Sequence, residues 1–125
     1  MKNYKINGAK DPAGHYTPIV EHNGVLYLSG IVPTDPFTGE KYGDTLEVQL
    51  RGVLRNLKLL LESADTTFDD LIKVCIYISE GEDWGLVNEV YKEILGDSKP
   101  ARLVIPVGKF HKGYLVEIDG IAQNK

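Results

Sequence analysis

Between residues 44 and 64, apolar side chains recur every three or four positions, which is the spacing of one face of an α-helix. The pattern predicts an amphipathic helix. Asp44, with Glu47 three residues later, resembles a capping box and predicts where this helix starts. The apolar stripe consists of Leu46, Leu50, Val53, Leu54, Leu57, Leu60, Leu61 and Ala64.

A second helix is predicted in residues 82–96, where a shorter apolar stripe has the same spacing. Gly96 follows this stripe and suits a C-terminal cap, because glycine adopts the left-handed conformation without strain. Both predicted helices are apolar on one side, so each should pack that side against a sheet. The stripe of the second helix consists of Val87, Val90, Tyr91, Ile94 and Leu95.

The other regular segments are rich in β-branched and aromatic residues and predict strands. Residues 17–30 form a predicted hairpin that turns at Asn23-Gly24, a dipeptide that tolerates positive φ at both central positions. The short polar segment 108–113 predicts that the strands on either side of it are neighbours. Besides the hairpin, strands are predicted in residues 2–7, 71–79, 101–107 and 113–122.

The order of these elements predicts an α+β fold in one domain, residues 1–125, with both helices on one face of the sheet. Alternate positions of 71–79 and 101–107 are mostly apolar on both sides, which exceeds what a sheet with one solvated face carries. No helix remains to cover the second face. We therefore expect other subunits to cover it in a homo-oligomer.

Composition and charge narrow the classes of function. The chain is 42% hydrophobic and 26% charged, with a formal net charge of -4, which disfavours binding to nucleic acid. No segment approaches the roughly 18 apolar residues of a membrane span, and the first residues lack the apolar stretch of a signal peptide. Cys75, the single cysteine, excludes an internal disulfide and is interpreted as a core hydrophobe. We expect a cytoplasmic protein without a membrane partner.

Common motifs for cofactor chemistry are absent from the sequence. The three histidines are scattered and form no spaced ligand set with the cysteine, so we expect no metal site. No glycine-rich phosphate loop occurs, so we expect no nucleotide cofactor. Ser29 lacks the nucleophile elbow of serine hydrolases, and its simplest interpretation is a strand-end serine that satisfies backbone groups.

Arg102 interrupts an otherwise apolar strand, and a charge in such a place needs an anionic partner. Glu117 and Asp119 are two residues apart and share one face of another predicted strand. Two interpretations are open. Arg102 forms a structural ion pair with one of these carboxylates, or it binds a ligand carboxylate through two parallel hydrogen bonds, with Glu117 as the acid or base.

Several stretches together resemble the RidA/YjgF family of small deaminases, and the resemblance runs along nearly the whole chain. It implies a chorismate-mutase-like fold with a mixed sheet of about six strands and two helices on one face. It also implies a homotrimer with a central barrel and active sites between subunits. The stretches are "LYLSGIVPTDPFTGE", "VLRNLKLLLESADTTFDDLIKV", "VNEVYKEILG" and "KPARLVIPV".

The resemblance also implies an activity, the hydrolysis of enamine or imine acids such as 2-aminoacrylate to 2-keto acids and ammonia, without a cofactor. Arg102 matches the family arginine that binds the substrate carboxylate. Glu117 matches the glutamate that orients the hydrolytic water, which makes these two the catalytic pair. Tyr16 matches a tyrosine contributed across the subunit interface, and Ser29 matches a serine at the wall of the cleft.

Ile31 and Val104 complete the implied substrate-binding set, and both depart from the family pattern. Ile31 stands where glutamine is frequent, and His15 where proline is common. Leu103 and Val104 replace a frequent serine-cysteine pair, and Pro106 replaces a common glutamate. At position 104 the implied contact uses the main chain, which tolerates the change. His15 and Ile31 are expected to alter the shape and polarity of the site, and with them the substrate.

Two other functions stay open. One is a non-catalytic trimeric binder of small carboxylates, which would use Arg102 without activating water. The other is a ribonuclease or translation inhibitor, a description given to some members of the resembled family, which the acidic charge disfavours. The presence of Glu117 favours catalysis over binding alone.

Overall fold

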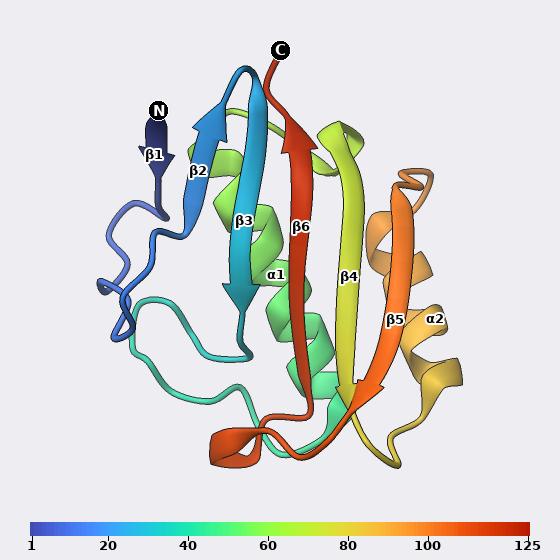
Figure 1. Ribbon diagram of the computed structural model, residues 1–125. Coiled ribbons are helices and arrows are strands. Elements are labelled where there is room, and N and C mark those ends of the chain that lie inside the picture. The colour runs from blue at the N-terminus through green and yellow to red at the C-terminus, as the bar shows by residue number, and fades with distance from the viewer.

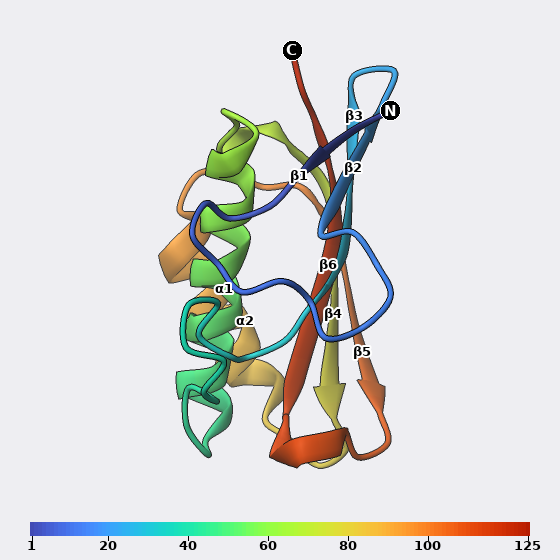
Figure 2. The same ribbon diagram turned by 90° about the vertical axis from the view of Figure 1, so that its left-hand side faces the viewer.

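The computed structural model describes residues 1–125 and contains one six-stranded mixed sheet with both helices on one face, which confirms the predicted α+β fold (Figure 1, Figure 2). The helices are α1 (Leu46–Ser63) and α2 (Trp84–Leu95), and neither is long and apolar enough to cross a membrane. The strands are β1 (Lys2–Tyr4), β2 (Ile19–His22), β3 (Val25–Ile31), β4 (Leu71–Ser79), β5 (Ala101–Val107) and β6 (Val116–Gln123). Across the sheet they follow the order β1-β2-β3-β6-β4-β5.

Helix α1 begins one residue later than the capping-box pattern predicts. The cap is Thr45, whose extended backbone lets its side-chain oxygen accept a hydrogen bond from the Val48 N–H at 3.3 Å. Asp44 lies outside the helix, and its carboxylate pairs with the Lys41 ammonium at 2.9 Å. The predicted Asp44 cap is therefore wrong, because threonine in the next position already satisfies the free N–H.

The predicted turns hold in the structure. Asn23 and Gly24 have φ of 51° and 77°, so both central residues of the β2–β3 hairpin adopt the left-handed conformation. Gly96, at the end of α2, has φ of 59° and donates its N–H to the Lys92 carbonyl. All three residues therefore have the positive φ that the prediction requires.

The strands on either side of segment 108–113 are not neighbours, so that expectation is wrong. Strand β6 lies between β3 and β4 and is antiparallel to both, whereas β5 lies at the edge, parallel to β4 (Figure 1). Helix α2 makes the crossover that a parallel pair requires. The segment only has to span two strand spacings, about 10 Å, which six residues reach easily.

The hydrophobic core fills the space between the sheet and the two helices. It includes the fully buried Leu54 and Leu57 of α1 and Ile76 and Ile118 of the central strands. Burying apolar surface stabilises a fold by on the order of 25 cal/mol per Å², and the burial of this one continuous layer holds the helices on the sheet.

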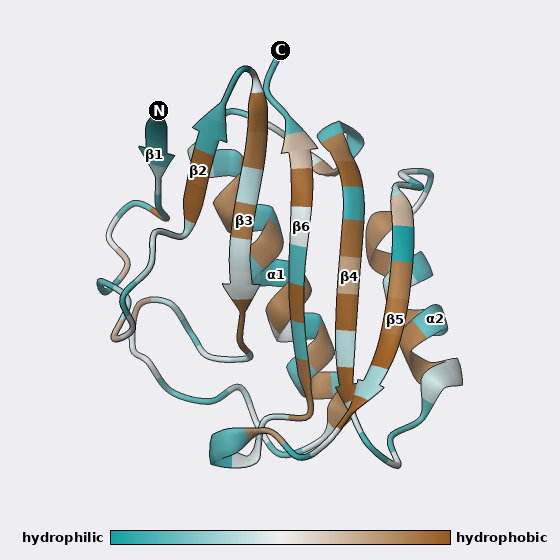
Figure 3. Ribbon diagram, viewed as in Figure 1, coloured by the Kyte–Doolittle hydropathy of each residue, from teal (hydrophilic) through white to brown (hydrophobic).

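No helix covers the opposite face of the sheet (Figure 2), which carries apolar side chains beside the carboxyl groups of Glu117 and Asp119. Tyr27 and Leu103 on this face are 48% and 47% exposed, and hydrophobic residues run along most of β4 and β5 (Figure 3). Cys75 lies here as well, half-buried between Lys73 and Tyr77 of the same face, which corrects its interpretation as a core residue. The prediction that apolar side chains also lie on the second face is confirmed. We call this second face the open face.

Candidate functional site

Arg102 lies on the edge strand β5 with an exposed side chain on the helix side of the sheet. Its register partner in β4 is Val74, which is fully buried against the helices. The guanidinium carbon lies over the ring of Tyr91 from α2, 5.1 Å from the ring centroid. Arg102 takes part in none of the six salt bridges of the chain. The structural ion pair with Glu117 or Asp119 is therefore not formed within one chain.

The free edge of β5 also presents main-chain groups. The Val107 carbonyl accepts a hydrogen bond from the Glu80 N–H at 2.8 Å, so the backbone groups of Val107 point toward β4. Backbone direction alternates along a strand, so the N–H and C=O of Arg102 and Val104 point to the free edge. Pro106 has the same parity and lacks an N–H, as an edge strand permits. The Val104 side chain is buried, which leaves only its main chain available to a ligand.

Glu117 lies on the open face, where its register partner in β4 is Tyr77. Partial burial raises the pKa of the Glu117 carboxyl above its usual value, and the nearby negative charge of Asp119 raises it further. The Tyr77 hydroxyl donates a hydrogen bond of 3.4 Å to Asp119. A carboxyl group with a raised pKa is a stronger base than an ordinary carboxylate, which suits it to accept a proton.

The Glu117 carboxylate reaches toward Gly30 of β3. A side chain at position 30 would overlap the Glu117 Oε2 atom, so only glycine lets this carboxylate lie against the strand. The register between β3 and β6 shifts between Leu28 and Ile31, which is the irregular stretch that contains Gly30. The bulge and the missing Cβ together make room for Glu117.

Tyr16, Ser29 and Ile31 line one groove of about 380 Å³ between the loop before β2, the end of β3 and the loop after it. The Ser29 hydroxyl donates a hydrogen bond of 2.6 Å to the Thr17 carbonyl, which is the backbone role that its position predicts. Ile31 is buried, and Tyr16 is half exposed. Gly30 also lines the groove, so the groove extends to the residue against which Glu117 lies.

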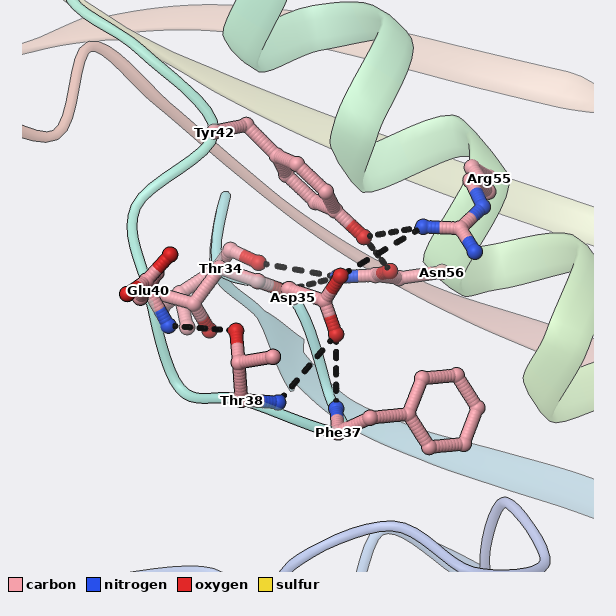
Figure 4. Close-up of polar contacts among 9 residues, drawn as sticks. Thr34, Asp35, Phe37, Thr38, Glu40, Tyr42, Arg55 and Asn56 are labelled. Atoms are coloured by element: carbon pink, nitrogen blue, oxygen red, sulfur yellow. Dashed lines mark hydrogen bonds and ion pairs between the residues drawn. The ribbon is translucent and has the colours of Figure 1, made fainter.

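A buried amide on α1 holds the loop that forms one wall of the groove (Figure 4). Asn56 donates hydrogen bonds to the carbonyls of Thr34 at 2.8 Å and Val32 at 3.3 Å. It accepts one from the Tyr42 hydroxyl at 2.8 Å, and Arg55 donates to that same hydroxyl at 3.0 Å. These hydrogen bonds fix the segment after β3 to the helix.

A second buried amide, Gln49, holds the segment that leads into β6. It donates to the carbonyls of Gly43 at 2.9 Å and Gly113 at 3.1 Å and accepts from the Leu115 N–H at 2.7 Å. Gln49 and Asn56 were not predicted from the sequence. Their signal was available, because both polar residues fall on the apolar face of α1 at the spacing of Val53 and Leu60.

One chain does not bring the implied site residues together. Tyr16, Ser29 and Ile31 share the groove, and Glu117 lies at its Gly30 wall. Arg102 lies on the other side of the sheet, with β4 between β5 and β6. No three His, Cys, Asp or Glu side chains are grouped so that they could hold a metal ion.

The chain is similar to known proteins along nearly its whole length. The family model described as endoribonuclease L-PSP matches residues 7–124. A RutC family protein of Pyrococcus horikoshii is 40% identical, covering 91% of this chain and 90% of its own. The 2-iminobutanoate/2-iminopropanoate deaminase of Mus musculus is 33% identical, covering 94% and 88%. The crystal structure of E. coli TdcF with bound serine has a TM-score of 0.90 and 29% identity over the full length of both chains.

The match with the family model spans nearly the whole chain, and two relatives above 30% identity cover more than nine tenths of it. The fold of the chain agrees with that of the solved relative over the full length of both. The chain therefore belongs to the RidA/YjgF family, which the matching model describes as endoribonuclease L-PSP.

Proposed function

We propose that the protein hydrolyses small imine or enamine acids, such as 2-aminoacrylate, to 2-keto acids and ammonia. One observation carries the proposal: the chain offers an arginine without a carboxylate partner at a free strand edge and a carboxyl group of raised pKa beside a groove. The first suits the acid group of such a substrate, and the second suits proton transfer. The mouse relative, at 33% identity, is named as a deaminase of 2-iminobutanoate and 2-iminopropanoate.

Each residue has a defined task in this reaction. Arg102 binds the substrate carboxylate with two parallel N–H donors, and the Val104 main chain lies on the same edge. A water molecule adds to the carbon of the protonated imine and gives one proton to Glu117, which leaves a neutral carbinolamine. Glu117 returns that proton to the nitrogen and then accepts the proton of the carbinolamine hydroxyl, so that the C–N bond breaks, the carbonyl forms and ammonia leaves. An enamine acid enters the same sequence after tautomerising to the imine.

The placement of the residues supports a site shared between subunits. Arg102 and Glu117 lie on opposite faces of one sheet, so a common site requires the β5 edge of one subunit to approach the groove of another. The open face carries exposed apolar side chains, whose burial between copies would stabilise an assembly. We propose a homotrimer in which the open faces meet at the centre and Tyr16 contributes from the neighbouring subunit.

The proposal is tested by measuring release of 2-keto acid when an amino-acid oxidase generates the imine in situ. Arg102→Ala should lower kcat/KM by about one to two orders of magnitude, because a hydrogen bond to a charged group is lost. Arg102→Lys should recover little of this loss, since lysine keeps the charge but not the planar fork. Lys99→Ala removes an exposed cation three residues away and should leave kcat/KM unchanged.

A stability measurement separates this proposal from a structural role. If Arg102→Ala melts far below the parent and still turns over substrate, Arg102 supports the fold and the functional assignment fails. Glu117→Gln should slow turnover and leave binding of the 2-keto acid product largely intact, because an amide cannot take the proton from water.

A non-catalytic binder of small carboxylates is the second candidate, because the E. coli TdcF relative is described with bound serine. That function needs Arg102 but not Glu117. Two results together would favour this non-catalytic function. The wild type would release 2-keto acid no faster than the enzyme-free control, and calorimetry would show that it binds the same acids.

A further inference from the structure

The ring of Tyr91 lies against Arg102, the proposed carboxylate-binding residue, and Tyr91 has no role in the proposed reaction. It lies on α2 with 8% of its surface exposed, and Cζ of Arg102 lies over its ring, 5.1 Å from the centroid. At this distance the negative face of an aromatic ring attracts a guanidinium group. The contact joins a buried residue of the helix layer to an exposed residue of the sheet edge.

Arg102 has no other polar partner within the chain. Its guanidinium takes part in no salt bridge, and no hydrogen bond joins it to another side chain. A long, exposed arginine side chain samples many rotamers unless something holds it. The ring of Tyr91 is therefore the contact that limits where the guanidinium lies in the free chain.

The position of the Tyr91 ring is fixed by helix α2 and by the packing of its neighbours. Asp83 caps α2 by accepting hydrogen bonds from the N–H groups of Gly85 at 2.8 Å and Leu86 at 3.3 Å, and Val87 and Val90 are buried beside Tyr91. The Tyr91 hydroxyl is buried without a hydrogen-bond partner, and burial raises the pKa of Tyr91 to about 12. The side chain is thus neutral, and its ring face, rather than its hydroxyl, contacts Arg102.

We propose that Tyr91 is a positioning residue that holds the Arg102 guanidinium in place to bind a ligand carboxylate. The inference rests on the proposed role of Arg102. A ring against one face of the guanidinium leaves the N–H donors, which lie in the plane of the group, free for a two-pronged contact with a carboxylate. The affinity for the acid then depends on the ring through the arginine.

The test measures binding of 2-oxobutanoate by calorimetry to wild type, Tyr91→Phe, Tyr91→Leu and each of these combined with Arg102→Ala. Tyr91→Phe should bind like the wild type, because the ring remains and the hydroxyl has no partner. Tyr91→Leu should bind about two- to fivefold more weakly, which corresponds to about 0.5–1 kcal/mol. In the Arg102→Ala background, Tyr91→Leu should cause no further loss.

Trp84→Leu is the matched control, since it removes an exposed aromatic ring from the same helix, and it should leave the affinity unchanged. If Tyr91→Leu does not fold in thermal melts, Tyr91→Met takes its place. Equal losses from the Tyr91 substitution with and without Arg102, or wild-type affinity in the leucine variant, would overturn the inference. If the single variant Arg102→Ala binds 2-oxobutanoate as tightly as the wild type, the proposed role of Arg102 is wrong. Because this variant keeps Tyr91, its result is distinct from a failure of the inference about Tyr91.

Discussion

Glu117 combines partial burial with a like charge two residues away, and both effects act in the same direction. Burial raises the pKa of the Glu117 carboxyl, and the charge of Asp119 adds to this. A carboxyl whose pKa is higher in the folded state than in the unfolded chain stabilises the fold below the unfolded pKa. That contribution is lost as the pH rises through the folded value.

Replacing Glu117 with glutamine removes this titration while keeping the size of the side chain. We expect the unfolding free energy of the wild type to fall relative to that of Glu117→Gln as the pH rises from about 4 through the folded pKa of Glu117, because the wild type must ionise a partly buried group. Urea unfolding at each pH measures the difference. Glu89→Gln, exposed on α2, is the control and should follow the wild type. A constant gap between wild type and Glu117→Gln would mean that the fold does not perturb this carboxyl.

At the scale of the elements, α1 does more than cover the sheet. Its buried face carries two amides, and each amide holds a loop by three hydrogen bonds. Asn56 fixes the segment that leaves β3, and Gln49 fixes the segment that enters β6. Because Gly30 and Glu117 lie close to these two segments, the helix sets the shape of the groove indirectly.

Asn56→Ala should lower the unfolding free energy by about 1–3 kcal/mol, since it leaves the carbonyls of Val32 and Thr34 without donors. Asn56→Asp should cost more, because a carboxylate replaces the donor amide with an acceptor that faces two carbonyls. Urea denaturation measures both. Lys58→Ala, exposed on the same helix, should change the free energy by less than about 0.5 kcal/mol. Equal midpoints for Asn56→Ala and Lys58→Ala would contradict the anchoring role.

The helices and the hairpin were predictable because local periodicity and turn chemistry determine them. The stripe from Leu46 to Ala64 gave α1, and the Asn23-Gly24 dipeptide gave the β2–β3 turn. The position of β6 was not predictable in this way. Strand pairing depends on which long-range contacts bury the most apolar surface, and a short connection allows more than one neighbour.

The site shows the same limit at the level of single residues. A period of two correctly put Glu117 and Asp119 on one face of β6, opposite Val116 and Ile118. The same period does not predict that Arg102 of β5 lies on the opposite face from Glu117. Which residues of β5 and β6 share a face depends on the register of each strand with β4. The anchoring amide Asn56 was readable in principle, as a polar residue on an apolar helix face.

At the scale of the whole molecule, two exposed apolar residues, Leu103 and Val48, lie on different surfaces. Leu103 is 47% exposed on the open face, in a row with Cys75 and Asp119, and its strand is at the edge of the sheet. Val48 is 45% exposed on α1, on the outer side of the helix layer. The two side chains have similar exposure in one chain. If substituting them has different effects on the mass in solution, that difference therefore arises from assembly.

Leu103→Glu and Val48→Glu therefore form a matched pair for the proposed homotrimer. Each places one carboxylate where a half-exposed apolar side chain stood, which costs a single chain little because water still reaches the site. If the open faces meet in the trimer, Leu103→Glu also forces a charge into an apolar interface, where desolvation without a partner is costly. Light scattering should then give a mass near three chains for the wild type and Val48→Glu and a mass near one chain for Leu103→Glu. A wild type that stays monomeric at micromolar concentration, or a Leu103→Glu variant that keeps the mass of three chains, would show that the open face is not the surface on which copies of this chain meet.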